Sequence, residues 1–327
     1  MNSMKFGFSP GTPPASQVSD ILTLGGSGYP FTVSASVPWA TVSPANGIAP
    51  QRITVRVDPS GLGAGTYTGT VTITAEGVTE QITVTAVVSP GPVITAVRNA
   101  ASLTANIAPN SFISIFGSGF AAAPAEWNPN TSLPTILGDV GVRISGKAAF
   151  ISYVNSGQIN LLTPPDAATG TVNVEVTTAA GTATSSAIAT PVTPSWFTYA
   201  AGKNTWMAAL FANTSTYVAP AGSLAGIVSR SAKAGDILQL YANGLGRTSP
   251  AAPSGVVLTT AYPLDDLSRV KVTIGGRPAT TLFAGLVAAG LYQINVEVPP
   301  GIGAGELPIE MFVDGQPTQG GVTLNFQ

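Results

Sequence analysis

One stretch of this sequence occurs twice. Residues 157–165 are Gly-Gln-Ile-Asn-Leu-Leu-Thr-Pro-Pro, and residues 291–300 are Leu-Tyr-Gln-Ile-Asn-Val-Glu-Val-Pro-Pro. Both copies share Gln-Ile-Asn, then three mostly apolar or β-branched residues, then Pro-Pro. A repeat of this kind predicts a duplicated domain. Neither copy carries an obvious catalytic group, so the duplicated unit has the character of a scaffold.

The similarity continues on both sides of the shared core. Both copies have the same three elements in the same order. These are a strand-like run into a glycine turn, a hairpin with a Ser-Gly or Gly-Gly turn, and a later alternating strand. The matching ranges are 111–120 with 236–245, 140–149 with 270–279, and 171–176 with 307–313. Alternation of period two around glycine turns is typical of antiparallel hairpins. The spacing differences between the copies are expected in loops, where insertions are tolerated.

Composition extends the same expectation to the whole chain. The 327 residues include 37 Gly and 27 Pro, which interrupt short runs of Val, Ile, Thr and Tyr. With 44% hydrophobic and 9% charged residues, the chain lacks the composition of a disordered protein. It also has no apolar run long enough to span a membrane. We predict an all-β protein of three tandem Ig-like antiparallel β-sandwiches, the last two being an internal duplication.

The domain boundaries follow from the proline-rich linker and the repeat. The first sandwich is predicted over residues 1–88, and residues 89–92, Ser-Pro-Gly-Pro, form a short stiff linker. The first copy of the duplication is predicted over residues 93–191 and the second over 192–327.

The first sandwich has a motif order of its own. Trp39 is followed by Ser-Pro-x-x-Gly at 43–47, an alternating strand at 53–57 and Ala-Gly-Thr-Tyr-Thr-Gly at 64–69. In this order, residues 4–88 resemble the BACON family of bacterial Ig-like β-sandwiches. The family name implies carbohydrate binding, and many members look like spacers.

The duplicated region resembles a second family. Its hallmarks are Gly-Leu-Gly at 244–246, Val-Thr-Ile-Gly-Gly-Arg-Pro-Ala at 272–279 and the repeat core at 291–299. Residues 93–327 are in this respect similar to the C-terminal domain of proteins from Solibacter and other Acidobacteria, and each half also resembles the IPT/TIG Ig-like fold. That family has no assigned activity to transfer, and its members typically form the C-terminal end of large secreted or surface proteins.

The sequence lacks the residue types on which several classes of function usually depend. The chain has no His and no Cys, which removes the commonest general base, the usual metal ligands and disulfides. Its net charge of −2, without a basic stripe, argues against nucleic acid and against docking on anionic membranes. We therefore expect no catalytic residues, no metal site, no cofactor and no membrane insertion.

Acidic residues are the remaining catalytic option. Asp265 and Asp266 form the only adjacent acidic pair, which could bind Ca²⁺ or act in glycoside hydrolysis. A solvated loop is the favoured interpretation, because no Asp-x-Asp-x-Asp run supplies further oxygen ligands. Glu175, Glu297 and Glu310 lie in alternating strands and are expected to face outward. An enzyme would need a carboxylate pair at glycosidase separation, about 5 to 9.5 Å.

The aromatic and lysine residues suggest further sites. Trp127, in a loop rich in proline and asparagine, and Trp206 are candidates for carbohydrate or interface contact, with local packing as the alternative. Trp39 is expected in the core.

Lys147 or Lys271 could form an intramolecular isopeptide bond if it met an Asn and a carboxylate in an apolar core. The repeated Gln-Ile-Asn is expected to serve structure, by satisfying backbone groups near a strand end.

The N-terminal segment also allows two interpretations. Residues 4–9 alternate, and they are predicted to be the first strand of their own sandwich. Alternatively, this segment, with Phe6 and Phe8, is a strand-exchange element that completes a neighbouring subunit. The first residues lack the apolar region of a signal peptide, so either a leader has been removed or export uses another route.

These observations favour a non-enzymatic, structural or adhesive protein on the outside of a bacterial cell, whether extracellular or on the cell surface. A subunit of a surface filament is one form that such a protein takes. The expected partners are further copies of the chain, other surface proteins or a polysaccharide. A carbohydrate-binding assembly and a passive spacer within a larger secreted protein are the alternatives.

Overall fold

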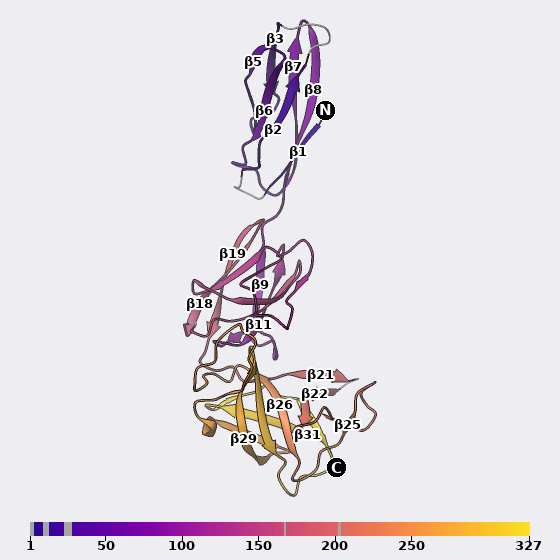
Figure 1. Cartoon of the computed structure of the whole chain (residues 1–327), viewed down its shortest axis with the longest axis vertical. Helices are drawn as coiled ribbons and strands as arrows, with labels where there is room; N and C mark the ends of the chain where they lie inside the picture. The colour runs from indigo at the N-terminus through magenta and orange to yellow at the C-terminus, as the bar shows by residue number, and fades with distance from the viewer. Residues whose placement is uncertain (1–2, 9–12, 23–27, 167, 202–203) are drawn as a thin grey trace. The chain divides into compact units, whose positions relative to one another are not determined.

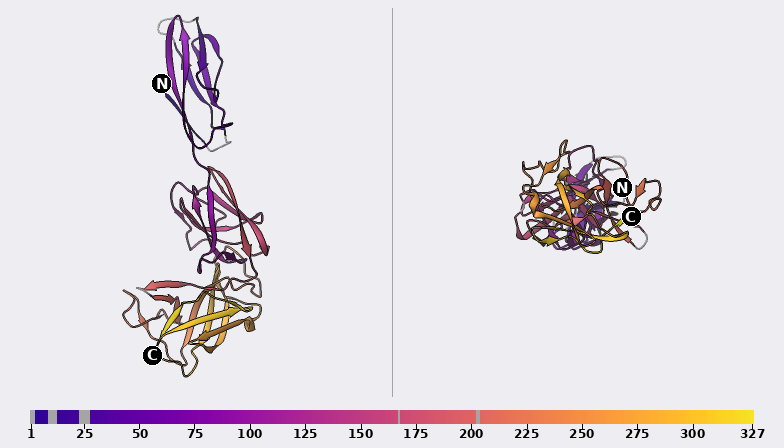
Figure 2. Two further views of the ribbon diagram at one scale, coloured as in Figure 1. Left: turned by 180° about the vertical axis from the view of Figure 1, so that it is seen from behind. Right: turned by 90° about the horizontal axis from the view of Figure 1, so that it is seen from below.

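The chain folds almost entirely into strands and loops (Figures 1 and 2). The computed structural model describes residues 3–8, 13–22, 28–166, 168–201 and 204–327. In that part of the chain the single helical element is η1, a 3₁₀ turn over Leu267–Arg269. No helix there is long and apolar enough to cross a bilayer. The predicted all-β fold of Ig-like antiparallel sandwiches is confirmed.

The chain divides into two compact units. The first comprises residues 1–92 with 177–183, and the second comprises residues 93–176 with 184–327. Both copies of the duplication lie mainly in the second unit, although each copy surrounds a hydrophobic cluster of its own. The predicted domain limits at 88, 92 and 191 remain predictions.

The first unit is a two-layer sandwich. Alternating apolar residues such as Phe31, Val55 and Val84 point inward from both layers and form its core. One sheet has the order β1 (Ser3–Phe8), β8 (Val78–Val88), β7 (Gly65–Ala75), β3 (Tyr29–Ala35) and β5 (Asn46–Ala49). The other has the order β2 (Gln17–Ile21), β6 (Gln51–Val57) and β4 (Ala40–Ser43).

The first copy of the duplication is also a two-layer sandwich, around Ile115, Ile159 and Val174. One sheet has the order β12 (Ala125–Glu126), β16 (Phe150–Val154), β17 (Gln158–Leu162), β11 (Phe112–Ser118) and β9 (Val93–Asn99). The other has the order β10 (Asn106–Ile107), β19 (Gly181–Ala189), β18 (Gly170–Thr178), β14 (Val140–Ile144) and β13 (Ile136–Leu137), with β15 (Lys147–Ala148) beside β14.

The second copy joins its two layers through one long strand, β29 (Arg277–Ala288). The start of β29 pairs with β28 (Val270–Ile274), and the remainder pairs with β30 (Leu291–Glu297). The continuous sheet has the order β21 (Thr198–Ala201), β22 (Asn204–Met207), β33 (Thr323–Phe326), β31 (Gly305–Val313), β28, β29, β30, β26 (Ile237–Asn243), β23 (Ala209–Phe211), β24 (Tyr217–Val218) and β25 (Ser229–Arg230). Three short strands lie beside this path: β20 (Ser195–Trp196), β27 (Tyr262–Pro263) and β32 (Gln316–Pro317). Its core includes Trp196, Tyr292 and Met311.

The register of the strands shows that the two copies are structurally equivalent around the repeat core. In the first copy Ser114 lies opposite Asn160, and in the second Gln239 lies opposite Asn295. A register shift occurs at the matching place in both, just before the partner of that asparagine. The internal duplication read from the sequence is therefore present in the strand pairing, including its irregularity.

Candidate functional site

The repeated Gln-Ile-Asn motif has the same internal contact in both copies. The Gln158 side-chain amide donates to Asn160 Oδ1 at 2.7 Å, and Gln293 donates to Asn295 Oδ1 at 2.8 Å. In the first copy Ser114 Oγ also donates to Asn160 Oδ1, at 2.8 Å. The motif pairs polar side chains on one face of the sheet while Ile159 and Ile294 enter the core. This supports the expected structural role, although the partners are side chains and not turn backbone groups.

The two tryptophans singled out from the sequence lie in different environments. Trp127 is half-buried, and its Nε1 donates to the Thr131 carbonyl at 2.9 Å. Trp206 is only 6% exposed, which agrees with local packing, the alternative to a contact role. It lies edge-on to Tyr199, with ring centroids 6.0 Å apart. Trp39 is half-buried against the core of the first unit.

Trp206 belongs to an aromatic group that the sequence did not reveal. Tyr199 stands edge-on to both Trp206 and Tyr217, with centroids 6.4 Å apart in the second pair. The Tyr199 hydroxyl is buried without a hydrogen-bond partner among the described residues. Burial, together with the nearby Tyr217, raises the pKa of Tyr199. The aromatic residues of Trp-Phe-Thr-Tyr at 196–199 are the only local sequence signal near this group.

Phe6 and Phe8 lie in the core of their own sandwich. Their exposed fractions are 2% and 8%, and β1 pairs in parallel with β8, Phe6 opposite Ala86. This arrangement agrees with the first interpretation of the N-terminal segment. Strand exchange between subunits requires that this pairing be replaced, and it stays a prediction.

Asp265 and Asp266 form contacts within the loop in which they lie. Asp265 forms an ion pair with Arg269, and Asp266 Oδ1 accepts from the backbone N–H of Ser268 at 2.8 Å. The Arg269 guanidinium also binds Asp314 at 2.6 Å, which lowers the pKa of that carboxyl group. Glu297 and Glu310 are exposed, and Glu175 is half-buried. In the part of the chain described here, no three acidic residues come close enough to hold a metal ion.

The two lysines are in the wrong place for an isopeptide bond. Lys147 and Lys271 are both exposed, whereas that chemistry needs a lysine in an apolar core. Lys147 instead forms an ion pair with Asp166.

A buried polar group joins the two copies of the duplication. Asn243, at the end of β26 in the second copy, is fully buried. Its Oδ1 accepts from the backbone N–H of Phe112 and its Nδ2 donates to the Phe112 carbonyl, both at 2.8 Å. An amide side chain thus continues the backbone pairing of β11 in the first copy. The same Nδ2 donates to Asn99 Oδ1 at 3.2 Å.

Asn99 completes the group from the end of β9. It is fully buried, and its Nδ2 donates to the carbonyl and the hydroxyl of Thr193, both at 3.2 Å. Its Oδ1 also accepts from the backbone N–H of Ala101 at 2.9 Å. We call Asn99, Thr193 and Asn243 the amide junction. Because buried amides are costly unless satisfied, this bonded set favours one fixed arrangement of the two copies.

Two glycines bring the copies into close contact. Gly290, in the turn between β29 and β30, has φ +64°, and a Cβ there would lie 2.6 Å from the Phe112 ring and 2.7 Å from Leu162. A Cβ on Gly255 would lie 2.4 Å from the Phe150 ring, and the Gly255 carbonyl accepts from Leu133 N–H at 2.7 Å. Backbone of the second copy therefore packs directly on side chains of the first.

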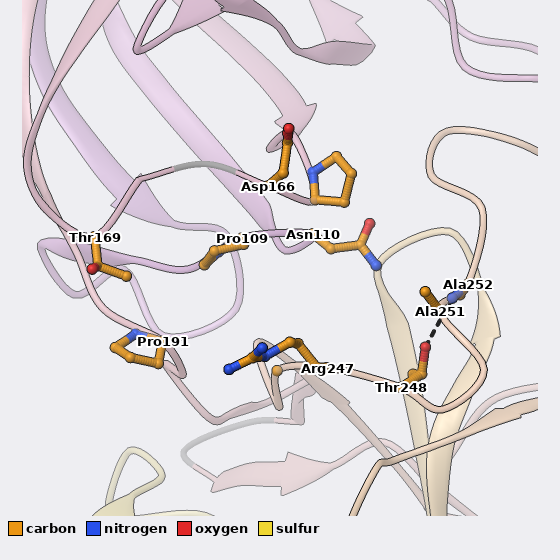
Figure 3. A pocket seen from close by; sticks show the side chains of 11 residues that line it. Pro109, Asn110, Asp166, Thr169, Pro191, Arg247, Thr248, Ala251 and Ala252 are labelled. Atoms are coloured by element: carbon orange, nitrogen blue, oxygen red, sulfur yellow. Dashed lines mark hydrogen bonds between the residues drawn. The ribbon is translucent and has the colours of Figure 1, made fainter.

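A pocket opens between the two copies (Figure 3). Its volume is about 660 Å³, within the range of small-molecule sites. The first copy contributes residues of three loop segments, and the second contributes the chain that follows the Gly-Leu-Gly hallmark. The lining residues are Pro109, Asn110, Pro165, Asp166, Thr169, Pro191, Gly246, Arg247, Thr248, Ala251 and Ala252. We call this the junction pocket.

Comparison with known proteins gives likenesses of fold. No family model and no curated protein matches the chain, so the specific BACON and IPT/TIG resemblances stay predictions. Among solved structures, the glycan-utilisation protein SGBP-B of Bacteroides ovatus, in complex with a mixed-linkage heptasaccharide, aligns at 13% identity with a TM-score of 0.29. That alignment covers 98% of this chain and 65% of SGBP-B.

Two titin fragments align as well. The I9–I11 tandem aligns at 8% identity with a TM-score of 0.31, over 99% of this chain and 96% of the fragment. The I67–I69 fragment aligns at 11% identity with a TM-score of 0.32, over 99% and 95%. These neighbours are proteins of Ig-like or β-sandwich domains, and at such scores they carry no inference about binding or activity.

Proposed function

We propose that this chain is a non-enzymatic structural and adhesive protein on the outside of a bacterial cell. The amide junction is the observation that carries the proposal. A pair of sandwiches with a fixed arrangement suits a structural or adhesive protein, because a rigid body transmits mechanical load without rearranging. The engagement of Asp265, Asp266 and Asp166 in ion pairs or loop caps supports the same role.

Adhesion is tested directly with the full chain. Fluorescently labelled protein is incubated with intact bacterial cells and with purified surface polysaccharide, and retention after washing is measured. We expect saturable retention on at least one of these surfaces, with no turnover of the polysaccharide. A chain that is strictly monomeric and binds neither surface contradicts the proposal.

Filament formation through strand exchange is a narrower version of this proposal. Because Met4, Phe6 and Phe8 fill their own core, deleting them would unfold the first unit and leave the result ambiguous. A better probe is a peptide with the sequence of residues 3–8, added during assembly and followed by negative-stain electron microscopy. Exchange of this strand predicts that the peptide shortens the filaments and that a scrambled peptide does not. If neither peptide changes the filaments, the contacts between subunits do not involve this strand.

Carbohydrate binding is the second candidate function, and Trp127 favours it. Its indole is held by the bond to Thr131 yet remains partly exposed, so its orientation is fixed before a sugar arrives. We expect Trp127→Ala to weaken binding in a glycan screen and to cost less stability than Trp206→Ala, because the Trp127 indole is only half-buried. Trp206→Ala is the contrasting variant, because the loss of a buried indole destabilises the fold by about 3 to 5 kcal/mol. Unchanged glycan affinity in Trp127→Ala would remove this residue from the candidate site.

A further inference from the structure

The junction pocket is preformed, because the copies that make its two sides are fixed to each other. Asn110 and Asp166 come from the first copy, and Arg247 and Thr248 from the second. The amide junction and the close packing at Gly255 and Gly290 hold these segments in place. A site whose walls are already positioned loses little ordering entropy when a ligand enters.

Arg247 supplies the pocket with a positive charge that the protein does not neutralise. The five ion pairs found among the described residues include Arg52, Arg230 and Arg269 but not Arg247. Figure 3 shows the Arg247 side chain extending into the pocket, toward Pro191. The only acid in the lining, Asp166, is paired with Lys147. The pocket therefore has a net positive character.

The neutral polar groups of the pocket are also donors. Asn110 Oδ1 already accepts from Ser254 Oγ at 2.9 Å, which leaves the two amide hydrogens of Asn110. Thr248 Oγ1 accepts from Ala252 N–H at 2.9 Å, as the dashed line in Figure 3 marks, and this leaves its hydroxyl proton. Thr169 adds a further hydroxyl to the lining. Donors from both copies thus line one cavity, which suits a ligand that carries hydrogen-bond acceptors.

The remaining walls are apolar, and no aromatic ring is among the described residues that line them. They consist of the pyrrolidine rings of Pro109, Pro165 and Pro191 and the methyl groups of Ala251 and Ala252. Such walls suit an aliphatic body better than a sugar ring that needs an aromatic platform. The guanidinium fork matches the two oxygens of a carboxylate.

We propose that the junction pocket binds a small organic anion with one carboxylate on a mostly aliphatic body. Arg247 pairs with the carboxylate, Asn110 and Thr248 offer further donors in the same pocket, and the proline rings cover the aliphatic part. The ligand touches both copies, so its binding also stabilises the second unit against unfolding. This site is independent of the adhesive surface proposed above.

Calorimetric titration of the full chain with cyclohexanecarboxylate, and with the neutral cyclohexanecarboxamide, tests the proposal. The two probes share the same body and differ in charge. We expect saturable binding of the carboxylate and an affinity for the amide that is weaker by about tenfold or more, as the loss of a charged hydrogen-bond pair implies. Equal affinity for both probes, or no saturable binding of the carboxylate, overturns the proposal.

Substitutions locate the binding. Arg247→Gln should weaken carboxylate binding by about tenfold or more and leave amide binding unchanged. Arg277→Gln removes an exposed arginine that does not line the pocket, and it should bind the carboxylate as the parent chain does. The carboxylate should also raise the thermal midpoint of the parent chain but not of Arg247→Gln. Equal weakening by both substitutions would mean that general charge, and not this pocket, attracts the anion.

Discussion

The two copies of the duplicated sandwich share strand pairing but differ at one aligned position. Ser118 ends β11 in the first copy and is exposed, whereas Asn243 ends β26 in the second and is fully buried. Asn243 has become an anchor because the first copy lies against it. Equivalent backbone positions in a duplicated fold therefore carry a surface residue or a buried contact according to what each copy adjoins.

The turns of the two copies show the same contrast. In the first copy the turn before β17 folds back on its own sandwich, where Gly117 N–H donates to the Gly157 carbonyl at 2.9 Å. In the second copy the corresponding turn contains Gly290, which packs against Phe112 and Leu162 of the first copy. The difference teaches that the contact between copies is built from the strand ends and turns of the second sandwich, while the sheets themselves are alike.

The largest expected effect comes from removing the anchor. Asn243→Ala leaves the N–H of Phe112 without its partner and removes a bond to Asn99. It also removes one of the two donors to the Phe112 carbonyl, which keeps the backbone N–H of Ala100. We expect a loss of about 3 to 4 kcal/mol in the free energy of unfolding, measured by denaturant titration of the full chain. Ser118→Ala is the matched control, and it should change stability by less than about 0.5 kcal/mol. Similar losses in both variants would contradict the contrast.

The next effect concerns the turn. Gly290→Ala combines a left-handed backbone with a clash on Phe112 and Leu162, so we expect a loss of about 2 to 3 kcal/mol. Gly276→Ala has a comparable φ of +76° with open space around it, and it isolates the backbone penalty of about 1 kcal/mol. If the two substitutions lower the free energy of unfolding equally, the close packing at Gly290 does not add to the backbone penalty.

A smaller effect should separate the repeated asparagines. Asn160 accepts from Gln158 and Ser114, whereas the side-chain bond found for Asn295 comes from Gln293 alone. Asn160→Ala should therefore be less stable than Asn295→Ala by about 1 kcal/mol in the same titration. The reverse order would show that the extra serine contact is not stabilising.

The smallest effect depends on pH and concerns the ion pair between Arg269 and Asp314 in the second copy. Arg269 lowers the pKa of Asp314 in the folded protein, so the ion pair stabilises the fold above the unfolded pKa of about 4 and is lost as the pH falls through the lower folded value. We expect Asp314→Asn to be less stable than the parent by under about 1 kcal/mol at pH 7, with the gap closing below about pH 4. A gap that persists at low pH would assign the effect to something other than this charge.

The sequence predicted the parts of this fold that depend on local pattern. Alternation, glycine turns and the repeated Gln-Ile-Asn gave the hairpins and the duplication, because strand period and turn chemistry are local properties. The sequence left Trp206 open between a contact role and local packing, since polar neighbours in the chain do not show what packs against a side chain from elsewhere. The amide junction was missed for the same reason: Asn99 and Asn243 are distant in sequence. The serine-to-asparagine difference between the aligned copies was the one available clue.

The central claim is that the amide junction makes the two copies a single cooperative body. Hydrogen exchange of the full chain, followed by mass spectrometry, tests it by comparing the opening free energies of β17 and β30, one core strand from each copy. The account predicts equal values in the parent chain and separate values in Asn243→Ala. Unequal values in the parent chain, or values that remain equal in Asn243→Ala, would contradict it.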